Sequence, residues 1–177
     1  QAQREIALSV GEPPATIGYP PSVFATLPHL VERSGNGIVG GGSITAIYTV
    51  LADGDDLNDP VVDSARGVLD GHFVLSRTLA GQGTYPAIDI EKSVSRVMNE
   101  IVSAEQSQAA RDIKELYSAY MQNIDLVSVG AYQQGSNPTV DRALNLYPKI
   151  VNYIRQERST SVSYPQSVDE LKAILHG

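Results

Sequence analysis

The fold class can be inferred from one short stretch, TYPAIDIEKSVSRV, which runs from Thr84 to Val97. Its Tyr-Pro pair predicts a turn, AIDI predicts a short apolar strand, and EKSVSRVMNEIV predicts a helix. A strand that leads directly into a helix is typical of α/β layer architectures. Arg96 lies near the start of this predicted helix in a chain that is acidic overall. The stretch therefore predicts an α/β fold and raises the question of which negative charge Arg96 meets.

Strand and helix patterns alternate on the N-terminal side of this stretch. SITAIYTVL (43–51) is β-branched and apolar on both faces, which predicts a buried strand in a mostly parallel sheet. HFVLS (72–76) predicts another strand, and RTLAGQG (77–83) predicts a helical turn. Between them, Asp59 and Pro60 predict a helix start, because aspartate caps helices and proline suits the first helical position.

The first forty residues predict two helices and two loops. QAQREIALSVG reads as a helix stopped by Gly11 with no cap before it, so we expect the chain to begin inside a structural unit. GEPPATIGYPPS predicts a loop, and Ser22 is the expected cap of the next helix. GNGIVGGGS (35–43) lacks the lysine of a phosphate-binding P-loop, so it predicts a flexible connector.

After residue 98 the sequence predicts helices only. Apolar residues recur at helical spacing after Ile113, and Asn137 with Pro138 predicts the start of a further helix. SVDE at Ser167–Glu170 is a capping-box pattern for the last helix. We therefore expect two domains, an α/β part over 1–97 and an all-helical part over 98–177.

Composition excludes several classes of function. The 177 residues carry a formal net charge of −7, and both halves are acidic, which argues against general nucleic-acid binding. The chain has no cysteine, and His29, His72 and His176 lie far apart, so no metal site is expected. No apolar run is long enough to span a bilayer and no leader sequence opens the chain, so we expect a cytoplasmic protein. The residues alone complete no catalytic constellation.

Long blocks of the sequence nevertheless resemble a known family. AQREIALSVGEPPATIGYPPSVFATLPHLVER, GSITAIYTVLADGDDLNDPVVDSARGVLDGHFVLSR and YPAIDIEKSVSRVM resemble the C-terminal half of the type III secretion ATPases, relatives of the rotary ATP synthase catalytic subunit. ERSGNGIVGGGSITA and DLVSVGAYQQGSNP are most similar to the flagellum-specific branch. The resemblance implies that residues 1–97 are the second half of a RecA-like nucleotide-binding core and that 98–177 are the helical C-terminal domain.

The resemblance also implies roles for four residues. Arg96 matches the arginine finger, which in the assembled ring reaches the γ-phosphate held by a neighbouring subunit. A planar, always charged guanidinium suits that task. Tyr85, followed by Pro86, matches the aromatic residue that packs on adenine. Tyr153 corresponds more loosely to the opposite wall of the adenine site, and packing on a helix face is an equally good interpretation of it. A structural ion pair with Asp89 or Glu91 is the alternative for Arg96.

Further segments match regions that contact partners in the family. Glu12, Pro13 and Pro14, together with Asp55 and Asp56, match loops that face a central coiled-coil stalk. Residues 131–141 match the region that couples nucleotide state to partners and export cargo. The resemblance implies a homohexamer with a stalk protein, a regulatory peripheral-stalk protein, export chaperones and an export gate as partners. It implies a cytoplasmic enzyme that is peripheral to the inner membrane.

The expected activity is ATP hydrolysis that energises flagellar type III secretion, with ATP and Mg²⁺ as ligands of the full enzyme. The Walker A and Walker B motifs of the family do not occur in this sequence, so we expect the chain alone to be inactive and to hold neither ligand. Two alternatives stay open at this point. One is the ATPase of a virulence injectisome, and the other is a non-catalytic module that binds export chaperones.

Overall fold

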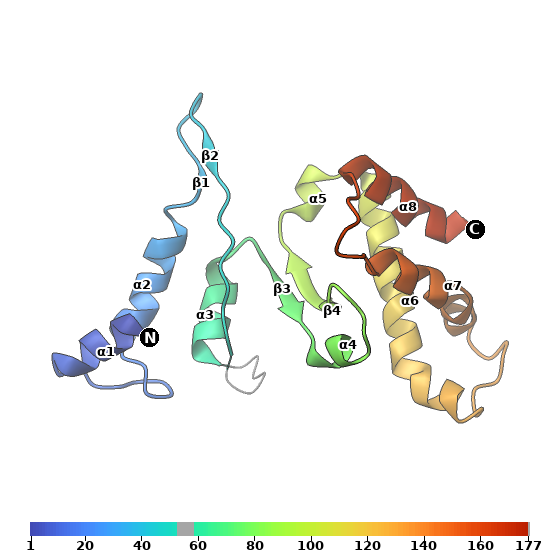
Figure 1. The fold of residues 1–177 in the computed structure, drawn as a ribbon, viewed down its shortest axis with the longest axis horizontal. Helices are drawn as coiled ribbons and strands as arrows, with labels where there is room; N and C mark the ends of the chain where they lie inside the picture. The colour runs from blue at the N-terminus through green and yellow to red at the C-terminus, as the bar shows by residue number, and fades with distance from the viewer. Residues whose placement is uncertain (53–58, 177) are drawn as a thin grey trace. The chain divides into compact units, whose positions relative to one another are not determined.

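The computed structural model describes residues 1–52 and 59–176 and contains helices and strands in two compact units, Gln1–Asp70 and Gly71–Gly177 (Figure 1). The predicted mixture of helix and strand is confirmed. The mostly parallel sheet is not, because both sheets of the described residues are two-stranded and antiparallel. None of the described helices combines the length and the apolar run that a bilayer span requires.

The described residues of the first unit form three helices, α1 (Ala2–Ser9), α2 (Pro21–Val31) and α3 (Pro60–Val68). Helix α3 starts as predicted, because the Asp59 carboxylate accepts hydrogen bonds from the amides of Val61 and Val62. The predicted cap at Ser22 is wrong. Pro20 precedes α2, Pro21 is its first residue, and the Ser22 amide instead donates to the carboxylate of Glu12.

The glycine-rich connector forms a short hairpin in the first unit. Strands β1 (Gly35–Asn36) and β2 (Ser43–Ile44) pair in antiparallel register, and Gly40 takes a positive φ of 82° in the loop between them. The buried strand predicted over 43–51 is wrong in this structure. Only Ser43 and Ile44 are in a strand, and Ile47 and Leu51 are each 90% exposed. No described strand pairs with 45–51.

The second unit begins with the strands β3 (Gly71–Leu75) and β4 (Ile88–Ser95), which pair antiparallel around the short helix α4 (Arg77–Gly81). A Cβ on Gly71 would lie 2.5 Å from the carbonyl oxygen of Val94, so only glycine permits this approach of the strands. The helix predicted from EKSVSRVMNEIV is wrong over most of its length. Pairing with β3 keeps the chain extended to Ser95, and only α5 (Met98–Ile101) is helical.

Three longer helices complete the second unit: α6 (Ala104–Ser128), α7 (Pro138–Ile154) and α8 (Tyr164–His176). The Asn137 side chain caps α7 as predicted. Helix α8 starts earlier than the capping-box pattern indicates, because the hydroxyl of Ser163 accepts from the Gln166 amide. Together the helices bury one apolar core: Ala109, Ile113, Leu116, Tyr117, Ala143, Ile150, Leu171 and Ile174.

Tyrosine side chains extend this core between α6 and α7. The rings of Tyr120 and Tyr147 stack with centroids 3.5 Å apart, and Tyr117 lies 5.9 Å from Tyr147. Burial is the main cause that raises the pKa of Tyr117 to about 12, and it also raises the pKa of Tyr147. These phenols therefore stay neutral at physiological pH and act as packing groups.

Candidate functional site

Arg96 lies at the bend that immediately follows β4, and its side chain is exposed. It is therefore presented by the end of a strand, not by a helix as the sequence predicts. Asp89 is one of the two carboxylates that the sequence offers as ion-pair partners of Arg96. Its carboxylate accepts hydrogen bonds from the backbone amides of Glu91 and Lys92 and lies 3.5 Å from the Lys92 ammonium. The Asp89 side chain thus has a local structural role in the β4 bulge.

Tyr85 projects from a turn that is held from two directions. The residue is 57% exposed, whereas its carbonyl oxygen accepts a hydrogen bond from the amide of Gln156, which follows α7. The preceding Thr84 is buried, its amide donates to the carbonyl oxygen of Leu79, and its hydroxyl accepts from Arg155. An exposed aromatic face on a fixed backbone is suited to stacking on a flat ligand.

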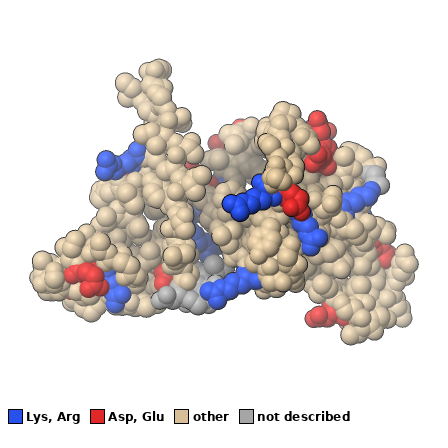
Figure 2. Space-filling model, in the orientation of Figure 1, with Lys and Arg blue, Asp and Glu red and all other residues tan. Residues whose placement is uncertain are grey.

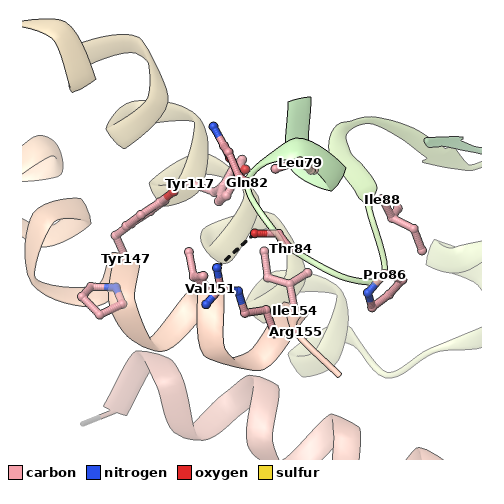
Figure 3. Close-up of a pocket in the computed structure, with 11 residues that line it drawn as sticks. Leu79, Gln82, Thr84, Pro86, Ile88, Tyr117, Tyr147, Val151, Ile154 and Arg155 are labelled. Carbon is pink, nitrogen blue, oxygen red and sulfur yellow. Dashed lines mark hydrogen bonds between the residues drawn. The ribbon is translucent and has the colours of Figure 1, made fainter. Parts of the chain in front are cut away.

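A cavity of about 420 Å³ lies beside this turn (Figure 3). The cavity wall is mostly apolar. Arg155 lines the cavity and donates a hydrogen bond to Thr84, which Figure 3 draws as a dashed line. A concave apolar site with few polar groups is typical of small-molecule sites. Pro86 lines the cavity, whereas Tyr85 and Tyr153 do not: the lining residues are Leu79, Gln82, Thr84, Pro86, Ile88, Tyr117, Tyr147, Pro148, Val151, Ile154 and Arg155.

Tyr153 lies on α7 and contacts the last helix. Its hydroxyl lies 3.1 Å from the carbonyl oxygen and 3.0 Å from the hydroxyl of Ser167. The nucleotide-binding role suggested by resemblance stays a prediction for Tyr153, as it does for Tyr85 and Pro86. Sequence reasoning missed Arg155 and Gln156, because contacts with a turn about 70 residues earlier leave no local pattern.

The predicted partner-facing loops are only partly described. Glu12 is half-buried and holds the Ser22 amide at 2.9 Å, while Pro13 and Pro14 are exposed. Asp55 and Asp56 lie outside the described residues. The stalk-facing role of all five residues stays a prediction.

The loop before α7 is closed by one carboxylate. Asp141 accepts from the hydroxyl of Tyr132 and from the amide of Gly135, each at 2.9 Å. These bonds fix the loop before α7, and the role toward partners and cargo that the resemblance implies for residues 131–141 stays a prediction.

Charged side chains are scattered over the face drawn in Figure 2, and no basic stripe is formed there. Within residues 1–52 and 59–176, no group of three or more His, Asp and Glu side chains is placed to hold a metal ion. Tyr85 and Arg96 offer an exposed aromatic side chain and an exposed guanidinium.

Comparison with protein families divides the chain into two matched parts. The ATP synthase alpha/beta family, nucleotide-binding domain, matches residues 1–95, and the T3SS EscN ATPase C-terminal domain matches residues 102–173. The flagellum-specific ATP synthase of Pseudomonas aeruginosa is 59% identical over 177 residues, and that of Salmonella typhimurium is 56% identical over 174. The chain spans only 39% and 38% of the lengths of these two relatives.

Solved structures give the same likeness. The assembled ATPase EscN from the enteropathogenic E. coli type III secretion system is 42% identical, with a TM-score of 0.94 over 98% of this chain and 42% of that chain. EscN in complex with its central stalk EscO is 41% identical, with a TM-score of 0.86 over 98% of this chain and 41% of that chain.

Proposed function

The chain belongs to the ATP synthase alpha/beta family, and on this premise we propose that it is part of a flagellum-specific ATPase that energises type III protein export. The 59% identity to the flagellum-specific ATP synthase of Pseudomonas aeruginosa, which extends over the whole chain, is the observation that carries this proposal. ATP hydrolysis in this proposal belongs to a longer protein, since the chain spans 39% of that relative.

The proposed architecture is the second half of a RecA-like core over 1–97 and an all-helical C-terminal domain over 98–177. The exposed apolar stretch 44–51 supports this assignment. Burying a strand that is apolar on both faces would require neighbouring strands, and the mostly parallel sheet of a complete core would supply them. The two family matches, to 1–95 and 102–173, are also compatible with the proposed boundary.

In this proposal Arg96 stabilises the transition state of phosphoryl transfer in a neighbouring subunit of a homohexamer. Its exposed position at the end of a paired strand supports the proposal, because a finger must leave its own subunit. An arginine finger contributes by matching the negative charge that develops on the transferring phosphoryl oxygens. The phosphate clamp and Mg²⁺ would be held by residues that this chain does not contain.

Tyr85 is proposed to stack on adenine, with Pro86 stiffening the turn. The exposed ring and the two hydrogen bonds from Arg155 and Gln156 to the turn support this role. Tyr153 is the weaker candidate for the opposite wall, since its hydroxyl is directed to Ser167.

The proposed partners are a coiled-coil stalk protein, a peripheral-stalk protein, export chaperones and the export gate, at the cytoplasmic side of the inner membrane. EscN, a similar protein, has been solved with its central stalk EscO, which supports the first of these.

An injectisome ATPase is the second candidate, and the 42% identity to EscN favours it. The genes beside the coding sequence discriminate the two: flagellar rod and hook genes support the first function, and needle-complex genes the second.

The decisive experiment is replacement of Arg96 by alanine in the assembled enzyme. We expect kcat for ATP hydrolysis to fall by roughly 10³- to 10⁵-fold. Arg142→Ala serves as the control. It removes an exposed guanidinium at a different place, on α7, and should leave kcat unchanged. The purified 177-residue chain should show no turnover, so Mg²⁺-dependent hydrolysis by it would contradict the proposal that it is inactive alone.

A further inference from the structure

We infer that Ser107 and Lys114 of α6 are positioning residues for Arg96, which they serve by fixing the chain on both sides of it. This inference rests on the proposed role of Arg96 in phosphoryl transfer. Neither residue would touch the nucleotide. Each acts through the backbone from which the arginine projects.

Ser107 holds the C-terminal side of this segment. Its hydroxyl donates to the side-chain oxygen of Asn99 at 2.7 Å and accepts from the guanidinium of Arg111 at 2.7 Å. Ser107 is only 7% exposed, so its single proton is committed to Asn99 in a site that water hardly reaches. Because Asn99 lies in α5, the bond joins the helix that follows Arg96 to α6.

Lys114 holds the N-terminal side. Its ammonium donates to the carbonyl oxygen of Ser93 at 3.2 Å, across 21 residues of chain. The hydroxyl of Ser93 in turn donates to the carbonyl oxygen of Asp89 and accepts from the amide of Val74 in β3. Ser93 is therefore fixed to α6, to β3 and to its own strand.

Arg96 lies midway between these two attachments, three residues from Ser93 and three from Asn99. Ser107 and Lys114 are seven residues apart, so they lie on the same face of α6, roughly 10 Å apart along its axis. A segment fixed at two points of one rigid helix has little freedom between them. The flexible arginine side chain therefore starts from a defined base, which lowers the entropy lost when it is placed on a phosphate.

The first test measures order in the 177-residue chain without any ligand. We expect the ¹⁵N order parameters of residues 94–99 to fall in Ser107→Ala and in Lys114→Met, from about 0.85 toward 0.6. Ser118→Ala is the matched control, because Ser118 lies on the same helix and its hydroxyl accepts only from Gln122 among the contacts described. Ser107→Thr keeps the hydroxyl and should restore the order. Unchanged order in both Ser107→Ala and Lys114→Met would overturn the inference.

The second test measures kinetics in the assembled enzyme. Ser107→Ala should lower kcat by about 10- to 100-fold with KM for ATP unchanged, because a misplaced finger affects the transition state and not substrate binding. In an Arg96→Ala background the same substitution should have no further effect. An equal loss in both backgrounds would show that Ser107 does not act through Arg96. If Arg96→Ala alone leaves kcat unchanged, the proposed function fails instead, whatever the order parameters show.

Discussion

The two compact units of this chain use similar sequence patterns with different results. Residues 71–176 bury a continuous apolar core between α6, α7 and α8, centred on Ile150. The described part of residues 1–70 forms the helices α1, α2 and α3 but leaves Ile47 and Leu51 almost fully exposed. The difference shows that helices form in both units, whereas stability requires a packed face. We expect the second unit to carry most of the folding free energy.

Two matched isoleucine substitutions test this contrast most strongly. Ile150 is 0% exposed and Ile47 is 90% exposed. Ile150→Ala should lower the free energy of unfolding by about 2–5 kcal/mol, because it removes buried methyl groups and leaves a cavity. Ile47→Ala should change it by less than about 0.5 kcal/mol. Urea denaturation, with hydrogen exchange as the probe, measures the free energy of unfolding of both variants. Equal losses of this free energy in the two variants would contradict the contrast.

Alkaline pH should destabilise the second unit selectively. Burial raises the pKa of Tyr117 to about 12, above its usual value of 10.0, so the folded state keeps its phenolic proton at a pH where the unfolded state loses it. Stability contributed by this group is present below pH 10 and is lost as the pH rises toward 12. The loss should reach up to about 2 kcal/mol, measured by urea denaturation at a series of pH values. Tyr117→Phe should flatten this dependence, and an unchanged slope would contradict it.

Removing a helix cap should lower stability by a similar amount in both units, and this loss should be smaller than those expected for Ile150→Ala and for alkaline pH. Asn137→Ala removes the cap of α7, and Asp59→Ala removes the cap of α3. Each should cost about 1 kcal/mol, because two first-turn amides lose their acceptor. Hydrogen exchange of the amides of Val140 and Val62 reports each helix separately. Protection unchanged in either variant would mean that the cap does not stabilise that helix.

The same contrast explains what could be predicted from the sequence. Asp59–Pro60 and Asn137–Pro138 identify helix starts correctly, because a cap and the amides it satisfies lie within a few residues. The local pattern of 91–102 predicts a helix, which is wrong before Met98, because that pattern does not reveal that β3 pairs with residues up to Ser95. Strand pairing depends on residues far away in the chain.

In the candidate site, too, contacts between residues far apart in the chain escape prediction from the sequence. The family resemblance points to Tyr85 and Arg96, and the structure places each on an exposed turn or bend. The groups that hold them, Arg155 and Gln156 for Tyr85 and Ser107 and Lys114 for Arg96, carry no motif. Their contacts span 8 to 71 residues of sequence, so only the folded chain reveals most of them.

The stacked rings of Tyr120 and Tyr147 have a practical consequence for spectroscopy. The chain has nine tyrosines and no tryptophan, so its near-ultraviolet absorption and emission come almost entirely from phenol rings. Six of the nine lie after residue 98, and a fixed stacked pair in an asymmetric surrounding gives a circular-dichroism band that a mobile ring does not. The helical part therefore carries its own optical reporter, and its melting can be followed without a label.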